Sequence, residues 1–220
     1  MKIIYTLLIS LLYITCAAQK SDSTRVRKTA IDYNLIEEST ELKSKPHIKN
    51  GSAEVFLNDK LMATGLYNQN ERVGRWRFFK YKTDTISQIY NYNLKKIEYN
   101  VPDTTIAYNI DSLNQGDKVL YPVKIGNMHD LYSYLTSSTK IPEELFQKNT
   151  DYKVTFFLTI NEFGKITKLI VDYKLENNGK TYELVDQNHQ YKDFDFSPAI
   201  VNGKAVDSQM ILKVMARITN

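Results

Sequence analysis

The sequence contains one cysteine, three histidines and five prolines among its 220 residues. Cys16 lies at the end of an N-terminal apolar run, and cleavage after Ala18 would leave a chain without cysteine, hence without disulfides, a thiol nucleophile or a thiolate metal site. His47, His129 and His189 are far apart and have no partners at the spacing of a zinc site. Five scattered prolines do not form an extended proline-rich spacer.

The residue patterns of common catalytic sites are also missing. The chain has no G-x-S-x-G sequence and no glycine-rich phosphate loop. Two close acidic pairs are Glu143-Glu144, which we place at the start of a helix, and Asp193 with Asp195, which we place in a turn. Neither setting favours acid–base catalysis by paired carboxylates. We therefore expect a protein that is not an enzyme and that uses no cofactor and no metal.

Charge does not indicate a nucleic-acid partner. Lysine and arginine number 29 and aspartate and glutamate 25, and the two signs are mixed along the chain rather than clustered on a basic segment. Trp76 lies between Arg75 and Arg77, an arrangement that could serve single-stranded nucleic acid. On a strand, however, Trp76 would face away from both arginines, so we predict a buried tryptophan with solvated arginines.

The N-terminus has the features of a secretory signal peptide. One basic residue, Lys2, precedes an apolar run that ends in Cys16-Ala17-Ala18. We predict a signal peptide over residues 1–18 and an exported protein, periplasmic or associated with the envelope. Retention as a membrane anchor would require about 20 apolar residues. Lipidation at Cys16 is a second alternative, although the Tyr13–Thr15 segment before it lacks the small residues of a lipoprotein signal.

The next part of the chain divides by composition. Residues 19–50 are polar and are interpreted as a linker with a short helix or strand near 31–42. Residues 51–100 carry short alternating apolar runs separated by Asn- and Asp-containing turns, which predicts an antiparallel β-meander. Residues 101–120, with Pro102 and Gly116, are interpreted as an interdomain linker.

The meander resembles the MORN-type repeats of YwqK-like proteins. The string GSAEVFLNDKLMATGLYNQNERVGRWRFFK contains Gly65-Leu66-Tyr67 and Gly74-Arg75-Trp76, which match the glycine–aromatic units of those repeats. Each glycine would allow a tight or positive-φ corner, and the aromatic residue would pack across the hairpin. A plain meander without repeat ancestry is the alternative.

Residues 121–220 show a different order of elements. The spacing of apolar residues predicts a short helix over 128–135, and Pro142 before Glu143-Glu144 predicts the start of another. Strands are expected over 152–160, 165–175 and 210–218, with a turn over 161–164 and a weak helix over 181–187.

This region resembles the C-terminal domain of TonB. The segments IPEELFQKNTDYKVTFFLTINEFGKITKLIV and FDFSPAIVNGKAVDSQMILKVMARI carry the resemblance, although phenylalanine stands near where the family often has tryptophan. It implies an α+β domain of two or three short helices packed on a three-stranded antiparallel sheet. The residues of the fold-specifying motif are Phe196, Pro198, Ala199, Asn202 and Gly203.

The resemblance also implies how the domain would act. TonB-like domains bind extended segments of outer-membrane receptors, so the partner would be a protein or peptide segment in the envelope of a Gram-negative bacterium. We expect β-strand addition at the last strand, and no nucleic acid or small-molecule substrate. A TonB-type energy transducer for outer-membrane transport is the alternative. The predicted edge-strand contacts are Met210, Leu212, Lys213, Val214 and Arg217.

Overall fold

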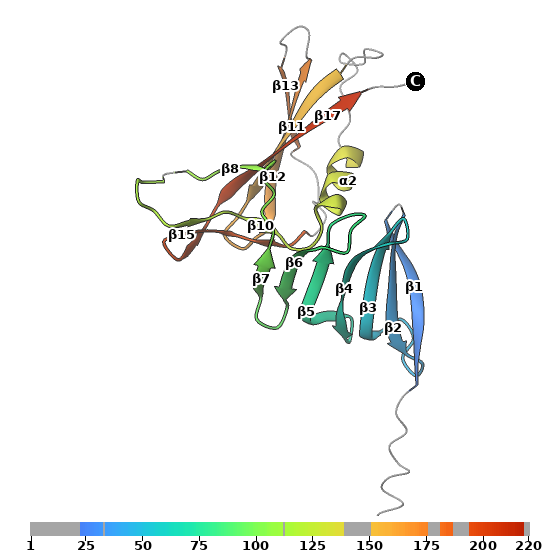
Figure 1. The fold of residues 1–220 in the computed structure, drawn as a ribbon. Coiled ribbons are helices and arrows are strands. Elements are labelled where there is room, and N and C mark those ends of the chain that lie inside the picture. Colours follow the sequence, from blue (N-terminus) through green and yellow to red (C-terminus); the bar gives the residue numbers. More distant parts are fainter. Residues whose placement is uncertain are drawn as a thin grey trace, which may run out of the picture.

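The computed structural model describes residues 23–32, 34–111, 113–138, 151–175, 181–186 and 194–217. Within these ranges the chain is mostly β, with two larger antiparallel sheets, two small ones and one helix (Figure 1). The predicted α+β fold, with several helices on a three-stranded sheet, is therefore wrong.

The first sheet is a meander of seven antiparallel strands in which every strand pairs only with its neighbours in sequence. It forms the lower right half of the molecule in Figure 1. Its strands are β1 (Thr24–Asp32), β2 (Leu35–Leu42), β3 (Lys49–Leu57), β4 (Lys60–Asn68), β5 (Glu71–Phe79), β6 (Ile86–Asn91) and β7 (Lys96–Asn100).

Two hairpins of the meander close through two-residue turns. Asn58 and Asp59 join β3 to β4 with φ of 48° and 60°, and Gln69 and Asn70 join β4 to β5 with φ of 50° and 71°. Positive φ at both central residues is the geometry of the type I′ turn, which matches the twist of the flanking strands. Asparagine and aspartate tolerate this conformation better than most residues.

The first two strands correct the interpretation of residues 19–50 as a linker. β2 alternates buried and less buried positions, as a strand does, but its buried side chains are Glu37, Ser39 and Glu41. Because the inward positions are polar, the sequence lacks the apolar alternation by which a half-buried strand is recognised.

Ion pairs neutralise the charges of the two buried glutamates. Glu37 pairs with the Lys49 ammonium and accepts a 2.9 Å hydrogen bond from the Tyr67 hydroxyl. Glu41 accepts hydrogen bonds from Arg25 Nε at 2.6 Å and from the backbone N–H of His47 at 2.7 Å. Removing either glutamate's partner would leave a buried charge unpaired, which is costly.

We expect the acid sensitivity of the protein to depend on Glu41. The Arg25 hydrogen bond, opposed by desolvation and aided by the His47 N–H, lowers the pKa of Glu41 below its ordinary value of 4.5. A carboxyl whose pKa is lowered by folding stabilises the native state above its unfolded pKa, and this contribution is lost as the pH falls through the folded pKa. Glu41→Gln should therefore flatten the loss of stability below about pH 4.5.

Thermal melts from about pH 6 to about pH 2 would measure this effect. Arg25→Gln removes the main cause of the shift and should flatten the same limb. An acid limb that keeps its slope in both variants would contradict the assignment.

The second sheet contains five antiparallel strands in the order β13-β12-β11-β17-β8. The helix α2 (Met128–Ser138) packs against it, with Leu131 and Leu135 fully buried in a core that includes Tyr152, Phe156 and Leu212. The strands are β8 (Ala107–Asn109), β11 (Asp151–Ile160), β12 (Ile166–Leu175), β13 (Thr181–Asp186) and β17 (Ser208–Arg217).

The sequence predicts three helices in this half. The helix over 128–135 is confirmed as α2. The weak helix over 181–187 is wrong, because Thr181–Asp186 forms β13 in register with β12; threonine, tyrosine and valine within it favour strands. The helix expected after Pro142 lies outside the described residues.

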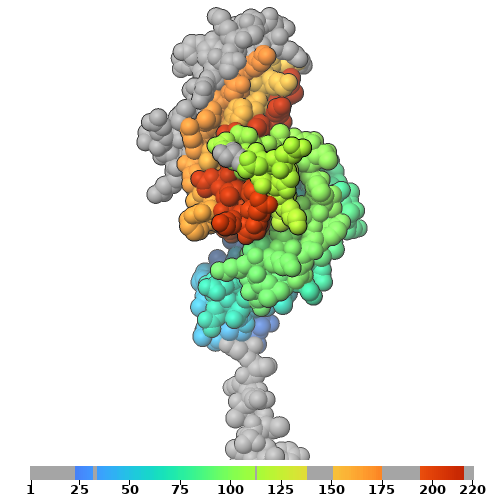
Figure 2. Space-filling model, turned by 90° about the vertical axis from the view of Figure 1, so that its left-hand side faces the viewer, coloured from blue at the N-terminus to red at the C-terminus, as the bar shows by residue number. Residues whose placement is uncertain are grey.

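Short strands complete the second half. β10 (Val123–Lys124) pairs with β14 (Phe196–Ser197), and β9 (Val119–Leu120) pairs with the hairpin of β15 (Ala199–Val201) and β16 (Lys204–Val206). Figure 2 shows the resulting contact, in which the green chain leading to α2 lies against the red segment that contains this hairpin. Long-range pairing thus attaches β8 to the second sheet and β9 and β10 to the small sheets, so this stretch is not a free linker.

Hydrogen bonds join the two halves at the segment before α2. The buried Gln88 side chain of β6 donates to the Lys124 carbonyl at 2.9 Å and accepts from the Gly126 N–H at 2.7 Å. Asn127 Nδ2 donates to the Met62 carbonyl of β4 at 2.8 Å. These bonds fix residues 124–130, the segment before α2 together with the first residues of that helix and here named the junction loop, over one face of the meander.

Candidate functional site

The last strand, β17, provides the first candidate site. On one side it pairs with β11 along its whole length, from Ser208 to Arg217. On the other side β8 pairs only with Gln209–Ile211, and no further strand among the described residues pairs with Leu212–Arg217 on this side. This part of β17 is therefore an open edge within the described structure.

The structure separates the five predicted contact residues into different environments. Met210 and Leu212 are buried in the core beneath α2, so they support the sheet and do not face a partner. Lys213 is exposed and Val214 is half-buried, and Arg217 pairs through its backbone with Asp151. Met215, which the sequence analysis did not single out, is 60% exposed.

The motif that resembled TonB lies around the β15–β16 hairpin. Phe196 and Ala199 are buried, and Pro198 is half-buried between β14 and β15. Asn202 and Gly203 form the hairpin turn, with φ of 51° and 82°.

Asn202 also ties this turn to the start of β9. Its side-chain oxygen accepts a hydrogen bond from the Lys118 N–H at 3.0 Å, and its Nδ2 donates to Asp117 at 2.7 Å. The asparagine thus has a structural role at this turn.

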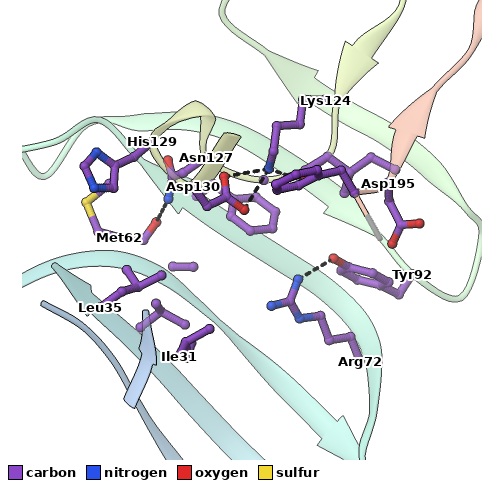
Figure 3. A pocket seen from close by; sticks show the side chains of 16 residues that line it. Ile31, Leu35, Met62, Arg72, Tyr92, Lys124, Asn127, His129, Asp130 and Asp195 are labelled. Carbon is purple, nitrogen blue, oxygen red and sulfur yellow. Dashed lines mark hydrogen bonds and ion pairs between the residues drawn. The ribbon is translucent and has the colours of Figure 1, made fainter. Parts of the chain in front are cut away.

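A cavity of about 220 Å³ lies between the meander and the junction loop (Figure 3). The junction loop and the segment containing Phe194 and Asp195 line it on one side, and strands β1 to β6 or their ends line it on the other. Ile31 and Asp195, which are exposed, line part of it, so the cavity is accessible from solvent. Its apolar lining comes from Ile31, Leu35, Val55, Met62, Ala63, Phe78, Ile125 and Phe194.

Arg72 of β5 is a cation in this cavity. Its guanidinium carbon lies 4.4 Å from the Trp76 ring centroid. Nη1 donates to the Tyr92 hydroxyl at 2.9 Å and Nε donates to the Tyr67 hydroxyl at 3.4 Å. Burial tends to lower the pKa of Arg72, but the neighbouring tyrosines outweigh it and the net direction is upward, so the group stays charged. A planar guanidinium held by a ring and two hydroxyls is fixed in orientation.

Two opposing effects act on the pKa of Tyr92, the tyrosine whose hydroxyl accepts the hydrogen bond from Arg72. Burial raises the pKa of Tyr92, and the charge and hydrogen bond of Arg72 oppose this rise. The net direction is upward, so the hydroxyl stays protonated at neutral pH and can accept from Arg72 while it keeps its own proton to donate.

Lys124 is a second cation of the cavity, and it is matched by an acid. Its side chain is 3% exposed, and Nζ lies 2.9 Å from Asp130 Oδ1 and 3.3 Å from the Ile125 carbonyl. Nζ also lies 5.5 Å from the Phe194 ring centroid. Asp195 pairs with Lys165 at 2.7 Å. These two ion pairs balance charge on the side of the cavity opposite the meander.

This cavity was not predicted from the sequence, although the sequence contains one signal for it. Arg72, Gly74 and Trp76 are two residues apart, so on a strand they share a face. An arginine on the face of a buried tryptophan could have been recognised as an inward-facing cation. Lys124 offered no such signal, because its burial depends on Phe194, seventy residues further along.

The described residues contain no group of three or more histidine, cysteine, aspartate or glutamate side chains placed to hold a metal ion. His47 contacts Arg27 and His129 lines the cavity, while His189 lies outside the described ranges. Of the acidic pairs, Asp195 is exposed, and Glu143, Glu144 and Asp193 also lie outside these ranges. None of the helices searched in the described part of the chain is both long and apolar enough to span a membrane.

Comparisons of the chain with family models, with curated proteins and with solved structures find no match.

Proposed function

We propose that this protein is a non-catalytic interaction module of the bacterial envelope, which binds an extended protein segment by β-strand addition to the open edge of β17. Export rests on the signal-peptide features of residues 1–18. The choice of binding mode rests on one observation about β17 and β8.

That observation is that the chain already adds a short strand to this side of β17. Ala107–Asn109 pairs with Gln209–Ile211, and the pairing then stops while β17 continues to Arg217. Backbone N–H and C=O groups on an uncovered edge can pair with an incoming strand. A partner segment would continue the line of β8 antiparallel to β17.

The exposed side chains along this edge indicate what the segment would carry. Lys213 and Met215 are both exposed and lie two residues apart, so they face the same side of the sheet. A segment with an acidic and an apolar residue at alternate positions would match them. By resemblance to TonB, a segment of an outer-membrane receptor is the partner class we favour.

The alternative, an energy transducer, makes a different demand on location. It must stay in the inner membrane, whereas an interaction module need not. Fractionation of cells into membrane and periplasmic pools distinguishes the two, because an energy transducer will be recovered entirely with the inner membrane.

Charge reversal at the edge should change partner affinity without unfolding the protein. Lys213→Glu places like charges opposite an acidic segment, and we expect binding to weaken about threefold to tenfold, as for an exposed charge contact. The probe is a synthetic peptide in which one glutamate and one valine lie two residues apart, so that both face the same side as Lys213 and Met215, titrated into the isotope-labelled full chain while amide chemical shifts are followed. Shifts confined to the meander would overturn the proposal.

A pair of prolines provides the control for the backbone. Lys213 and Val214 are adjacent, so their N–H groups point to opposite sides of the strand. Proline at one position should remove a donor needed by the partner, and proline at the other should break the ladder with β11 and lower stability. Equal effects of both on binding and stability would contradict strand addition at this edge.

A further inference from the structure

The cavity between the meander and the junction loop combines a fixed cation with an apolar lining. We propose that it is a binding site for a small organic acid, in which the carboxylate pairs with Arg72 and an apolar group fills the remaining space. This site is separate from the open edge of β17 and does not depend on the function proposed for that edge.

Charge balance points to an anion. Lys124 pairs with Asp130, and Asp195 pairs with Lys165. Arg72 has only neutral polar and aromatic neighbours, namely Tyr67, Tyr92 and Trp76, and no ion pair joins it to a carboxylate of the described residues. Because Asp195 is neutralised by Lys165 from outside the lining, Arg72 is the one of the four residues Arg72, Lys124, Asp130 and Asp195 that no ion pair matches.

The hydrogen bonds of Arg72 leave donors for a ligand. Nε is used by Tyr67 and one N–H of Nη1 by Tyr92. Both N–H groups at Nη2 remain, next to the second N–H of Nη1, and this edge of the guanidinium matches the two oxygens of a carboxylate. Figure 3 shows the guanidinium at the side of the cavity, with Leu35 and Met62 across from it.

The apolar lining selects what the carboxylate is attached to. A ligand must cover Leu35, Val55 and Phe78 as well as reach Arg72. Cavities of about 150 Å³ lined by apolar residues accept benzene. The 220 Å³ available here therefore fits an aromatic or branched aliphatic group on a short acid. Arg72 would repel a cationic ligand. A neutral ligand would leave a desolvated guanidinium without a counter-charge.

The chain carries its own reporter for this site. Trp76 is the one tryptophan in the sequence, and its ring lies 4.4 Å from the Arg72 guanidinium. Titration of the full chain with hydrocinnamate should give a saturable change in tryptophan fluorescence. Hydrocinnamamide, which has the same shape but no charge, should bind at least about tenfold more weakly, because a charge-assisted hydrogen bond is lost.

Substitutions distinguish the contribution of the Arg72 guanidinium to binding from that of the rest of the site. Arg72→Met should weaken hydrocinnamate about tenfold or more, and Arg72→Lys should restore part of the loss, since charge returns without the planar donor edge. Arg75→Met is the matched control on the exposed face of the same strand, and it should leave binding unchanged. Leu35→Phe fills cavity volume and keeps Arg72, and it should also abolish binding. This variant provides the test if Arg72→Met does not fold.

Two sources could supply such an acid, a free metabolite or the C-terminus of a polypeptide. The peptide Ala-Ala-Phe with a free carboxylate, compared with its amide and with hydrocinnamate, distinguishes them: tighter binding of the free-acid peptide indicates a chain terminus, and tighter binding of hydrocinnamate indicates a free acid. Equal affinity for acid and amide, or no response of either ligand to Arg72→Met and Leu35→Phe, would overturn the proposal. Lys213→Glu should not affect this titration, so its outcome is independent of the β17 edge.

Discussion

Trp76→Ala is expected to destabilise the protein by about 3–5 kcal/mol, the range for removing a large aromatic side chain from a core. The indole is fully buried at the centre of the meander face. Its ring meets Tyr67 edge-on at 5.2 Å and Tyr92 edge-on at 6.1 Å between centroids, and its Nε1–H donates to the Leu66 carbonyl at 3.1 Å. Truncation would leave a void beneath all these groups and an unpaired carbonyl.

The control for this substitution is next to it in the sequence. Arg75 lies on the opposite face, where its 66% exposed side chain pairs with Glu98. Arg75→Ala should change stability by no more than about 0.5 kcal/mol, as is usual for exposed ion pairs and surface positions. Chemical denaturation measures both values, and similar losses for the two variants would show that the strand faces the other way.

Gly164→Ala should cost about 3 kcal/mol or more, because two penalties combine at this residue. Its φ is 73°, a conformation that L side chains rarely adopt, and an added Cβ would lie 2.1 Å from the Phe196 carbonyl oxygen. That contact is with backbone, and the Phe196 N–H donates to the Gly164 carbonyl at 3.1 Å. The turn between β11 and β12 would therefore have to move away from β14.

Gly203→Ala isolates the conformational part of this penalty. Gly203 also has a positive φ, 82°, but an added Cβ meets nothing within 4 Å. Its substitution should cost about 1–2 kcal/mol, the usual penalty for an L residue in the left-handed region. Denaturant melts of the two variants test the difference. If Gly164→Ala were no worse than Gly203→Ala, the close approach of Gly164 to Phe196 would not exist in solution.

The parts of the fold that could be predicted from the sequence are those with local signals. The turns at Asn58-Asp59 and Gln69-Asn70 contain residues that accept positive φ, and the alternation around Trp76 places the indole inside. The positive φ predicted for Gly74 is confirmed at 62°, whereas Gly65 lies within β4 without a positive φ and instead leaves room for Trp76, since an added Cβ would lie 2.3 Å from that ring.

The parts that could not be predicted depend on contacts between distant residues. β8, β9 and β10 have three residues or fewer, too short for any periodic pattern, and they are defined by partners such as Ile200 and Met210, about 80 and 100 residues away. β2 could be predicted only as a short helix or strand near 31–42, because two of its inward residues are glutamates, which are matched by Arg25 and Lys49. The cavity was not predicted either, because Arg72 belongs to the meander and the junction loop belongs to the other half of the fold.

The meander has a further property that bears on how such a chain can change over generations. Every adjacent pair of its seven strands contains a register shift, from Ala30/Asp32 between β1 and β2 to Ile89/Tyr90 between β6 and β7. Such irregularities increase the local twist of each strand, so that a strand from another molecule pairs less readily with the edge of the sheet. Because each register is set within one hairpin, gain or loss of a whole hairpin at the β1 edge would leave the other registers intact. Duplication or deletion of single hairpins can therefore lengthen or shorten this sheet without redesigning what remains.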